Sequence, residues 1–233
     1  MSSARSGESV LALVRLLHLA SPTLPIGAYS YSQGLEWVVD ANVVHDGATA
    51  ERWMGDVLEC VIAHGEAPAA WRMLQSSAGS EWDRFREWNT WFLVSRETAE
   101  LRAETAQMGA ALFKLAVELE LIDAPTLSDL GEAQTWTLPA AYALASLGFG
   151  IDATAALTAY LWSWLENQVL AAMKAVPLGQ LAGQRLLRNL GQGIPAVVNI
   201  AQTTSDEDVT SFAPGLAIAS SRHETQYTRI FRS

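Results

Sequence analysis

The chain of 233 residues has a single cysteine, Cys60, and only four histidines. A lone cysteine excludes an intrachain disulfide and any thiolate cluster built within one chain. The first residues show no apolar signal core, and the apolar run 153–165 is shorter than the roughly twenty residues that span a bilayer. These absences predict a cytoplasmic protein that does not act in a membrane.

Positive charge is also scarce, because 15 Lys and Arg stand against 25 Asp and Glu, which gives a formal net charge of −10. Such a chain repels the phosphate backbone, which argues against a nucleic-acid partner. The sequence lacks the Gly-x-x-x-x-Gly-Lys-Ser/Thr loop that holds nucleotide phosphates. The run 191–193, Gly-Gln-Gly, follows a helical pattern and indicates a helix break rather than a dinucleotide site.

Half of the residues are hydrophobic and 17% are charged, which is typical of a folded chain with a large core. Apolar residues recur at helical spacing, and no series of alternating strands is present. We therefore predict an all-α fold, a single-domain helical bundle of about ten helices over 1–233. Asp152 is predicted to cap one of them. The clearest predicted helices cover 10–20, 51–64, 81–92, 97–121 and 184–190, with more helix within 138–175.

The two ends of this domain are predicted to differ from its middle. We expect residues 1–8 to be disordered and the polar, acidic segment 203–215 to be a mobile connector. The segment 216–233 is then a mobile tail that docks on a partner. Its last residues concentrate Arg, Tyr and Phe, which are enriched among interface anchors. If this tail is helical, Tyr227 and Phe231 lie four residues apart and present one aromatic edge.

Cys60 and His64 lie four residues apart on a predicted helix, with Glu66 just beyond. This spacing suits a borderline metal and keeps open a helical metal-dependent hydrolase. The simpler interpretation is that Cys60 packs in the core and His64 caps the helix end. Two ligands do not complete a site, so both residues are weak metal candidates and no catalytic residue is assigned.

The segment 21–36 departs from what packing alone requires. Two prolines and Gly27 fix a turn, after which the hydroxyls of Ser30 and Ser32 can cap a new helix. Both a rigid connector between helices and a presented binding loop fit this chemistry.

Three blocks of the sequence resemble the UreF family of urease accessory proteins. They read LHLASPTLPIGAYSYSQGLE at 17–36, VPLGQLAGQRLL at 176–187 and SRHETQYTRIFRS at 221–233. The blocks occur in the family's order over nearly the whole chain, and Ile26 stands where valine is common. The resemblance implies an all-helical homodimer that has no catalytic residues and works within a protein complex.

The resemblance also implies three partners: a UreD/UreH-type accessory protein, the GTPase UreG and urease apoprotein. Nickel is then handled transiently by the complex, and no cofactor is bound permanently. A rival interpretation is a metallochaperone that binds nickel by itself, which the few histidines and the single cysteine disfavour. The partner-binding residues implied by the resemblance are Pro22, Pro25, Gly27, Tyr29, Ser30, Gln33, Gly34, Glu36, Arg222, His223, Glu224, Tyr227, Arg229, Phe231 and Arg232.

Overall fold

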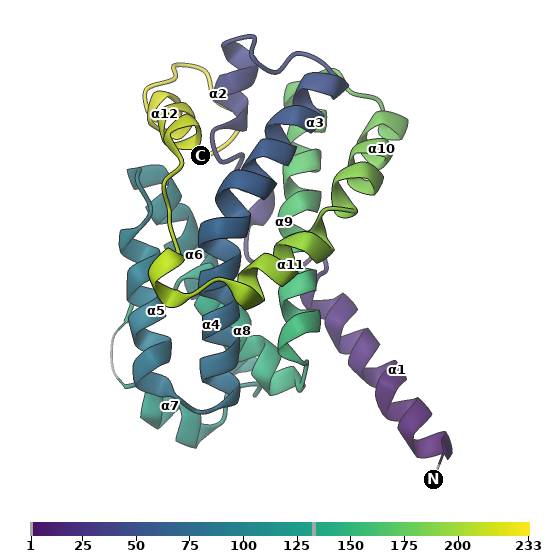
Figure 1. Cartoon of the computed structure of the whole chain (residues 1–233), viewed down its shortest axis with the longest axis vertical. Helices are drawn as coiled ribbons and strands as arrows, with labels where there is room; N and C mark the ends of the chain where they lie inside the picture. The colour runs from purple at the N-terminus through teal and green to yellow at the C-terminus, as the bar shows by residue number, and fades with distance from the viewer. Residues whose placement is uncertain (1, 132–133) are drawn as a thin grey trace.

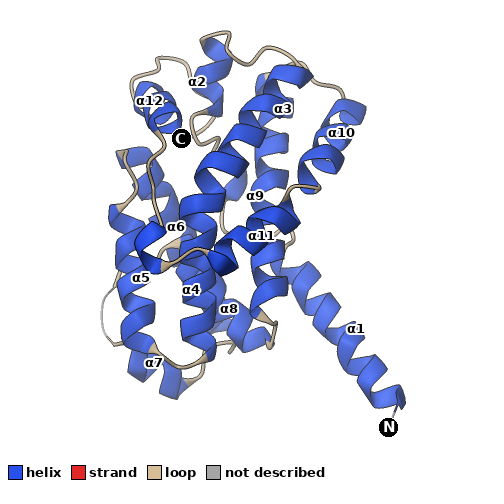
Figure 2. Ribbon diagram, viewed as in Figure 1, coloured by secondary structure: helices blue, strands red, loops and turns tan. Residues whose placement is uncertain are grey.

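The computed structural model describes the backbone of residues 2–131 and 134–233, and the side chains within these ranges from Val10 onward. Within this part the chain forms twelve α-helices, three further helical segments and no strand (Figures 1 and 2), which confirms the prediction of an all-α fold. The elements are α1 Ser2–Leu19, η1 Ala28–Ser30, α2 Leu35–Asp40, α3 Gly47–Asp56, η2 Val57–Glu66, α4 Ala67–Ala78, α5 Trp82–Val94, α6 Ala99–Glu118, α7 Ala124–Leu130, α8 Leu138–Phe149, α9 Ala153–Ala175, α10 Gln180–Gly191, α11 Ile194–Thr203, η3 Asp206–Asp208 and α12 Pro214–His223.

The centre of the bundle is built from α4, α6, α8 and α9. Helix α8 packs against both α4 and α6, and its buried face is rich in alanine, including Ala140, Ala141 and Ala145. Small side chains let neighbouring helices approach closely, as the composition of 138–175 indicates. The Asp152 carboxylate accepts hydrogen bonds from two backbone N–H groups in the first turn of α9, so the predicted cap is confirmed.

Helices α3 and α4 are joined end to end through η2, a π-helical stretch, and together they form one long rod. Pro68 lacks an N–H and cannot donate to the carbonyl of His64, four residues earlier, which explains the widened turns here. That carbonyl instead accepts a hydrogen bond from the Thr210 N–H at 3.0 Å. Gly65 permits this approach, because a Cβ on it would lie 2.5 Å from the Thr210 oxygen.

The segment 203–215 differs from the mobile connector that we expected, because side chains of the bundle hold it. Arg72 is buried, and its Nε donates to an Asp206 carboxylate oxygen at 2.6 Å while its Nη2 donates to the Thr204 carbonyl at 2.6 Å. Val209 is buried, and Thr210 is bonded to η2. Buried guanidinium contacts and one apolar anchor therefore fix a segment whose polar composition suggested mobility.

The tail 216–233 was also expected to be mobile, and it is instead folded onto the bundle. Helix α12 lies beside α2 and ends at His223, after which the chain turns back so that the C-terminus lies between these two helices (Figure 1). Phe231 and Ser233 are buried. The polar tail can be buried because its hydrogen-bond donors reach buried carboxylates of the bundle.

Helix α1 begins at Ser2, and the disorder expected for residues 1–8 stays a prediction. Its last turn is anchored by the buried Leu19 and by a hydrogen bond from Arg15 to the Phe149 carbonyl at 3.0 Å. The rest of the helix projects away from the bundle (Figure 1). No helix in the described ranges is both long enough and apolar enough to cross a bilayer.

Candidate functional site

The two segments predicted to bind partners meet in space, although they lie near opposite ends of the sequence. Helix α6 contributes two glutamates to the same place. We call this arrangement the terminal junction. It consists of Ser32, Gln33, Gly34, Glu36, Glu100, Glu104, His223, Phe231 and Ser233.

Glu36 is the hub of the terminal junction. Its carboxylate is buried and accepts hydrogen bonds from the backbone N–H groups of Ile230 and Phe231, at 2.6 and 2.9 Å. The second of its oxygens also lies 3.2 Å from Nε2 of the fully buried His223. The other ring nitrogen of His223 lies 2.7 Å from Glu100, which also accepts a hydrogen bond from Arg229 at 2.8 Å. One carboxylate therefore holds the tail by two backbone groups and one side chain.

Gly34 brings the N-terminal segment against α12. Its φ of +78° lies in the left-handed region that favours glycine. A Cβ at this position would lie 2.9 Å from the Ser220 nitrogen and 3.1 Å from the Cβ of Ala219. Only a residue without a side chain allows both this backbone angle and this contact. Glycine at position 34 therefore allows α2 to pack closely on α12.

A second layer of the junction surrounds Glu104. The Ser233 hydroxyl donates to Glu104 Oε2 at 2.7 Å, and Gln33 Nε2 donates to Oε1 at 2.8 Å. The backbone N–H and the hydroxyl of Ser32 both donate to the Ser233 carbonyl oxygen, at 2.7 and 2.5 Å. Burial raises the pKa of Glu104 to about 7, against the lowering effect of the two side-chain hydrogen bonds. A buried carboxyl whose pKa is raised to about 7 therefore contacts Gln33 of the segment 21–36 and Ser233 of the tail.

The remaining predicted residues are divided between the interior and the surface. Ser30 lies in the junction's rim, where its carbonyl accepts a hydrogen bond from the Arg232 N–H at 2.8 Å. Glu224 accepts one from the Glu100 N–H at 3.2 Å. Gly27 adopts φ +78° in the turn before η1. The side chains that point outward from these segments are Pro22, Pro25, Tyr29, Arg222, Tyr227 and Arg232.

The predicted aromatic edge of the tail is wrong. Phe231 is buried at 5% exposure, whereas Tyr227 is fully exposed, because the residues after His223 are not helical. The neighbouring Ile230 is also exposed, as is Tyr29. We call the exposed side chains of Tyr29, Tyr227 and Ile230 the outer face of the junction.

Sequence reasoning missed Glu100, Glu104, Ser32 and Ser233 as members of the junction. The signal for Glu104 was present, because it lies on the same helical stripe as Leu101, Met108 and Leu112. A glutamate on the apolar face of a predicted helix indicates a buried carboxylate that needs donors. Glu100, one turn earlier, lies on the flank of that stripe.

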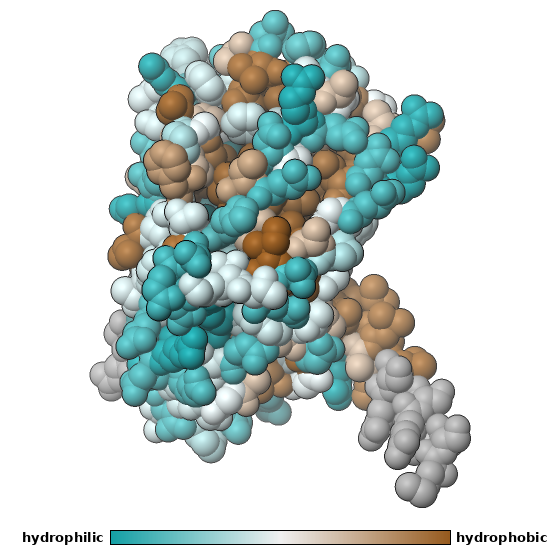
Figure 3. Space-filling view, viewed as in Figure 1, coloured by the Kyte–Doolittle hydropathy of each residue, from teal (hydrophilic) through white to brown (hydrophobic). Residues whose placement is uncertain are grey.

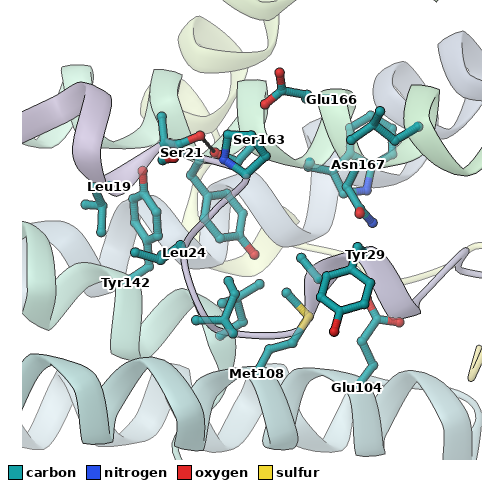
Figure 4. A pocket seen from close by; sticks show the side chains of 18 of the residues that line it. Leu19, Ser21, Leu24, Tyr29, Glu104, Met108, Tyr142, Ser163, Glu166 and Asn167 are labelled. Atoms are coloured by element: carbon teal, nitrogen blue, oxygen red, sulfur yellow. Dashed lines mark hydrogen bonds between the residues drawn. The ribbon is translucent and has the colours of Figure 1, made fainter.

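A cavity of about 100 Å³ lies behind the junction, beneath the loop 21–29 (Figure 4). Glu104 and Gln33 form part of its wall, and Glu66 and Tyr160 form another part. Tyr160 donates a hydrogen bond to Glu66 at 2.5 Å, and Arg96 donates to the same carboxylate at 3.2 Å. Burial first, and the neighbouring Glu66 second, raise the pKa of Tyr160. The junction and the cavity therefore share one wall of polar side chains.

Cys60, which the simpler interpretation placed in the core, is exposed, so that interpretation is wrong. His64 is also exposed, while Glu66 points inward to Arg96 and Tyr160. Within the described ranges, no three His, Cys, Asp or Glu side chains come together as a possible metal site.

A family model described as UreF matches residues 44–191. The chain is 52% identical over 233 residues to the urease accessory protein UreF of Azoarcus sp. (strain BH72), covering 99% of this chain and 100% of that protein. It is 46% identical over 233 residues to the protein of the same name from Methylobacillus flagellatus, covering both fully. It is 47% identical over 222 residues to that of Janthinobacterium sp. (strain Marseille), covering 95% of this chain and 98% of that protein.

Proposed function

The chain belongs to the UreF family of urease accessory proteins, and from this premise we propose that it is a scaffold that joins other proteins during urease maturation. In this proposal it holds a UreD/UreH-type accessory protein and the GTPase UreG together at urease apoprotein. The complex inserts nickel, which this protein handles only transiently and does not bind as a permanent cofactor. It works in the cytoplasm as a homodimer.

The observation that carries the proposal is the outer face of the junction. Tyr29, Tyr227 and Ile230 are each at least 66% exposed, although the segments that carry them are pinned by buried hydrogen bonds. Exposed aromatic side chains on a rigid support lose little conformational freedom when a partner binds. Tyrosine and arginine are also the residue types most enriched among interface anchors, and Arg222 and Arg232 lie on the same segment.

The docked tail changes how the partner is expected to bind. A free tail would have to fold onto a partner and lose conformational entropy in doing so. The tail of this protein is already ordered by Glu36 and Glu104, so we propose that the UreD/UreH-type partner binds the outer face of the junction in place. The junction then acts as a preformed platform.

For the homodimer we propose the apolar face of α1. This face is formed by Val10, Leu13, Val14 and Leu17, each between 54 and 62% exposed. Brown atoms mark it in Figure 3 where α1 leaves the body of the protein. The spacing of these residues gives one stripe along a projecting helix, and a symmetric pair of such stripes is a common way to bury apolar surface.

The test is a pull-down of the purified UreD/UreH-type protein and UreG by this protein carrying Tyr227→Ala and Ile230→Ala. Each anchor contributes about 2 kcal/mol if it lies at the centre of the interface, so affinity should fall at least about thirtyfold. The matched control is Phe212→Ala, because Phe212 is 81% exposed and lies on the connector beside η2. Full partner binding by the double variant would contradict the proposal.

A further inference from the structure

The last residue of α12, His223, is enclosed between two carboxylates. Its side chain is fully buried, with Nδ1 2.7 Å from an oxygen of Glu100 and Nε2 3.2 Å from an oxygen of Glu36. The side chains of Glu100 and Glu36 are themselves only 13 and 8% exposed. Glu100 comes from α6 and Glu36 from α2, so the ring of His223 joins the tail to two helices of the bundle.

These two contacts fix the protonation state of the ring. A neutral imidazole has one N–H and one bare nitrogen that only accepts, and an ionised carboxylate also only accepts. A neutral His223 would therefore hold a bare nitrogen against a carboxylate oxygen, in a place that is closed to solvent. The imidazolium ion, with an N–H on each nitrogen, can donate to Glu36 and Glu100 at the same time.

The proton lies on the ring and not on either glutamate, because both carboxylates accept hydrogen bonds from other donors as well. The two oxygens of Glu36 accept from the N–H groups of Ile230 and Phe231, at 2.6 and 2.9 Å. The second oxygen of Glu100 accepts from Arg229 at 2.8 Å. Donors of this kind favour the ionised carboxylate. With a protonated ring, two cations then face two carboxylates in the junction.

Other charged groups on the elements around the ring do not replace it. Helix α12 packs against α2 and α6. In α2, in the first two turns of α6 and in the chain from Pro214 onward, the remaining charged side chains are exposed or contact other groups; they are Asp40, Arg102, Glu104, Arg222, Glu224 and Arg232. The cations that contact Glu36 or Glu100 in the described ranges are therefore His223 and Arg229.

We propose that the terminal junction is a proton-dependent latch, in which the tail docks while His223 carries a proton on each ring nitrogen and is released when one proton is lost. Loss of the proton leaves a bare nitrogen facing a carboxylate and one negative charge of the junction without its cation. Undocking returns the ring and both carboxylates to water. Tyr227 and Ile230 then lose their fixed positions, so the proton also controls the outer face.

Docking should therefore weaken as pH rises. A histidine in water loses its proton above about pH 6.5. Because the docked tail keeps the proton and the undocked tail does not, each further pH unit weakens docking by up to about tenfold. Below about pH 6 both states hold the proton, so docking no longer depends on pH through this group.

The protonation of the ring is tested by nitrogen-15 NMR of the full chain labelled at histidine. The exposed rings of His18, His45 and His64 serve as references for histidine in water. At pH 7.5 we expect the signals of two N–H nitrogens from His223, and of one N–H and one bare nitrogen from a reference ring. A His223 ring with one bare nitrogen in the docked tail would overturn the proposal.

The release of the tail is tested by amide hydrogen exchange of the full chain between pH 6 and 8.5. Protection factors, which correct for the intrinsic effect of pH on exchange, are measured for Ile230 and Phe231 and for the amides of α4 as a report of global unfolding. We expect the protection of Ile230 and Phe231 to fall at least about tenfold relative to α4 over this range. Protection that does not change with pH would overturn the proposal.

Glu100→Gln is the discriminating variant. Its amide oxygen can still accept from Arg229, and its amide nitrogen can donate to the bare nitrogen of a neutral ring. The protection of Ile230 and Phe231 in this variant should therefore stay within about threefold between pH 6 and 8.5.

Glu104→Gln is the matched control, because Glu104 also contacts the tail and its pKa is raised to about 7. Its tail should lose protection with pH as the unmodified protein does. If Glu104→Gln abolishes the pH dependence, or if Glu100→Gln shares it, His223 is not the latch. If Glu100→Gln does not fold, the ring protonation and the Glu104→Gln comparison decide the question.

Discussion

The two ends of this protein are organised in opposite ways. The C-terminal tail is polar and carries three arginines, yet it is held in the bundle by the buried carboxylates of Glu36 and Glu104. Helix α1 is apolar along one face, yet that face is exposed and the helix projects away from the bundle. Composition alone predicts the reverse, a free polar tail and a packed apolar helix.

This contrast teaches that burial follows available partners as well as hydrophobicity. A polar tail can be buried when the bundle supplies matching acceptors, since a satisfied polar group loses little on leaving water. An apolar helix stays exposed when no complementary surface exists in the same chain, and large exposed apolar faces mark contacts with other proteins.

Glu36→Ala should break the docking of the tail. It leaves the N–H groups of Ile230 and Phe231 and the buried ring of His223 without their shared acceptor. Loss of one partner from a buried charged network costs about 3 to 5 kcal/mol of unfolding free energy. Urea denaturation measures the change, and the matched control is Glu59→Ala, whose exposed carboxylate has no such role. An equal, small effect of both variants would mean that the tail is not held by Glu36.

Gly34→Ala should destabilise the same contact by a steric route. Gly34 and Gly27 have the same φ of +78°, but only Gly34 lies against α12, whereas nothing lies within 4 Å of the Cβ position of Gly27. Gly27→Ala therefore reports the backbone strain alone, about 1 to 2 kcal/mol. Gly34→Ala should cost a further 1 to 3 kcal/mol or so, because the added methyl overlaps Ser220 and Ala219. Equal melting temperatures for the two variants would contradict a tight contact between Gly34 and α12.

Glu104→Gln should change how stability depends on pH. The pKa of Glu104 is raised to about 7 in the folded state, so between its ordinary value of 4.5 and about 7 the folded protein binds more protons than the unfolded chain. Stability is therefore greatest at low pH in this window and falls as pH rises, by about 1 kcal/mol between pH 6 and pH 8. Glutamine preserves a donor for Ser233 and an acceptor for Gln33.

Chemical denaturation at pH 6, 7 and 8 compares this variant with the unmodified protein. As pH rises, the unfolding free energy of the unmodified protein should fall relative to that of Glu104→Gln. The histidines are the same in both proteins, so their contribution cancels from this difference. A difference that does not change with pH would contradict a carboxyl that titrates near neutrality.

Leu13→Ser combined with Val14→Ser should have the smallest effect on the stability of the isolated chain. Both side chains are more than half exposed, so the change should lie within about 0.5 kcal/mol. Light scattering should nevertheless show that the variant is monomeric where the unmodified protein is dimeric. If the variant still dimerises, the homodimer does not form through the apolar face of α1.

Much of the fold follows from patterns that the sequence displays openly. The aromatic stripe of 81–92 is core, since Phe85, Trp88 and Phe92 are buried in α5. Asp152 caps α9 as its position predicts. Helical periodicity missed α7, because seven residues hold too few turns to show a stripe, and it also missed α4.

The site was harder to predict than the fold. The resemblance implied that Glu36 and His223 bind a partner, but no local pattern shows that the two side chains meet. Glu104 is buried, as its spacing from Leu101 and Met108 places it, but its charge gives no sign of which groups it contacts. Cys60 is exposed, although a lone cysteine is most often buried, so residue type alone gave the wrong environment for it.

Amide hydrogen exchange of the full chain tests most directly whether the tail is part of the protein's own bundle. The N–H groups of Ile230, Phe231 and Arg232 donate to Glu36 and to the Ser30 carbonyl, and that of Ser32 donates to Ser233. We expect residues 230–232 and Ser32 to exchange as slowly as the amides of α2 and to lose this protection together in Glu36→Ala. Exchange of 230–232 at the rate of an unstructured peptide would contradict it.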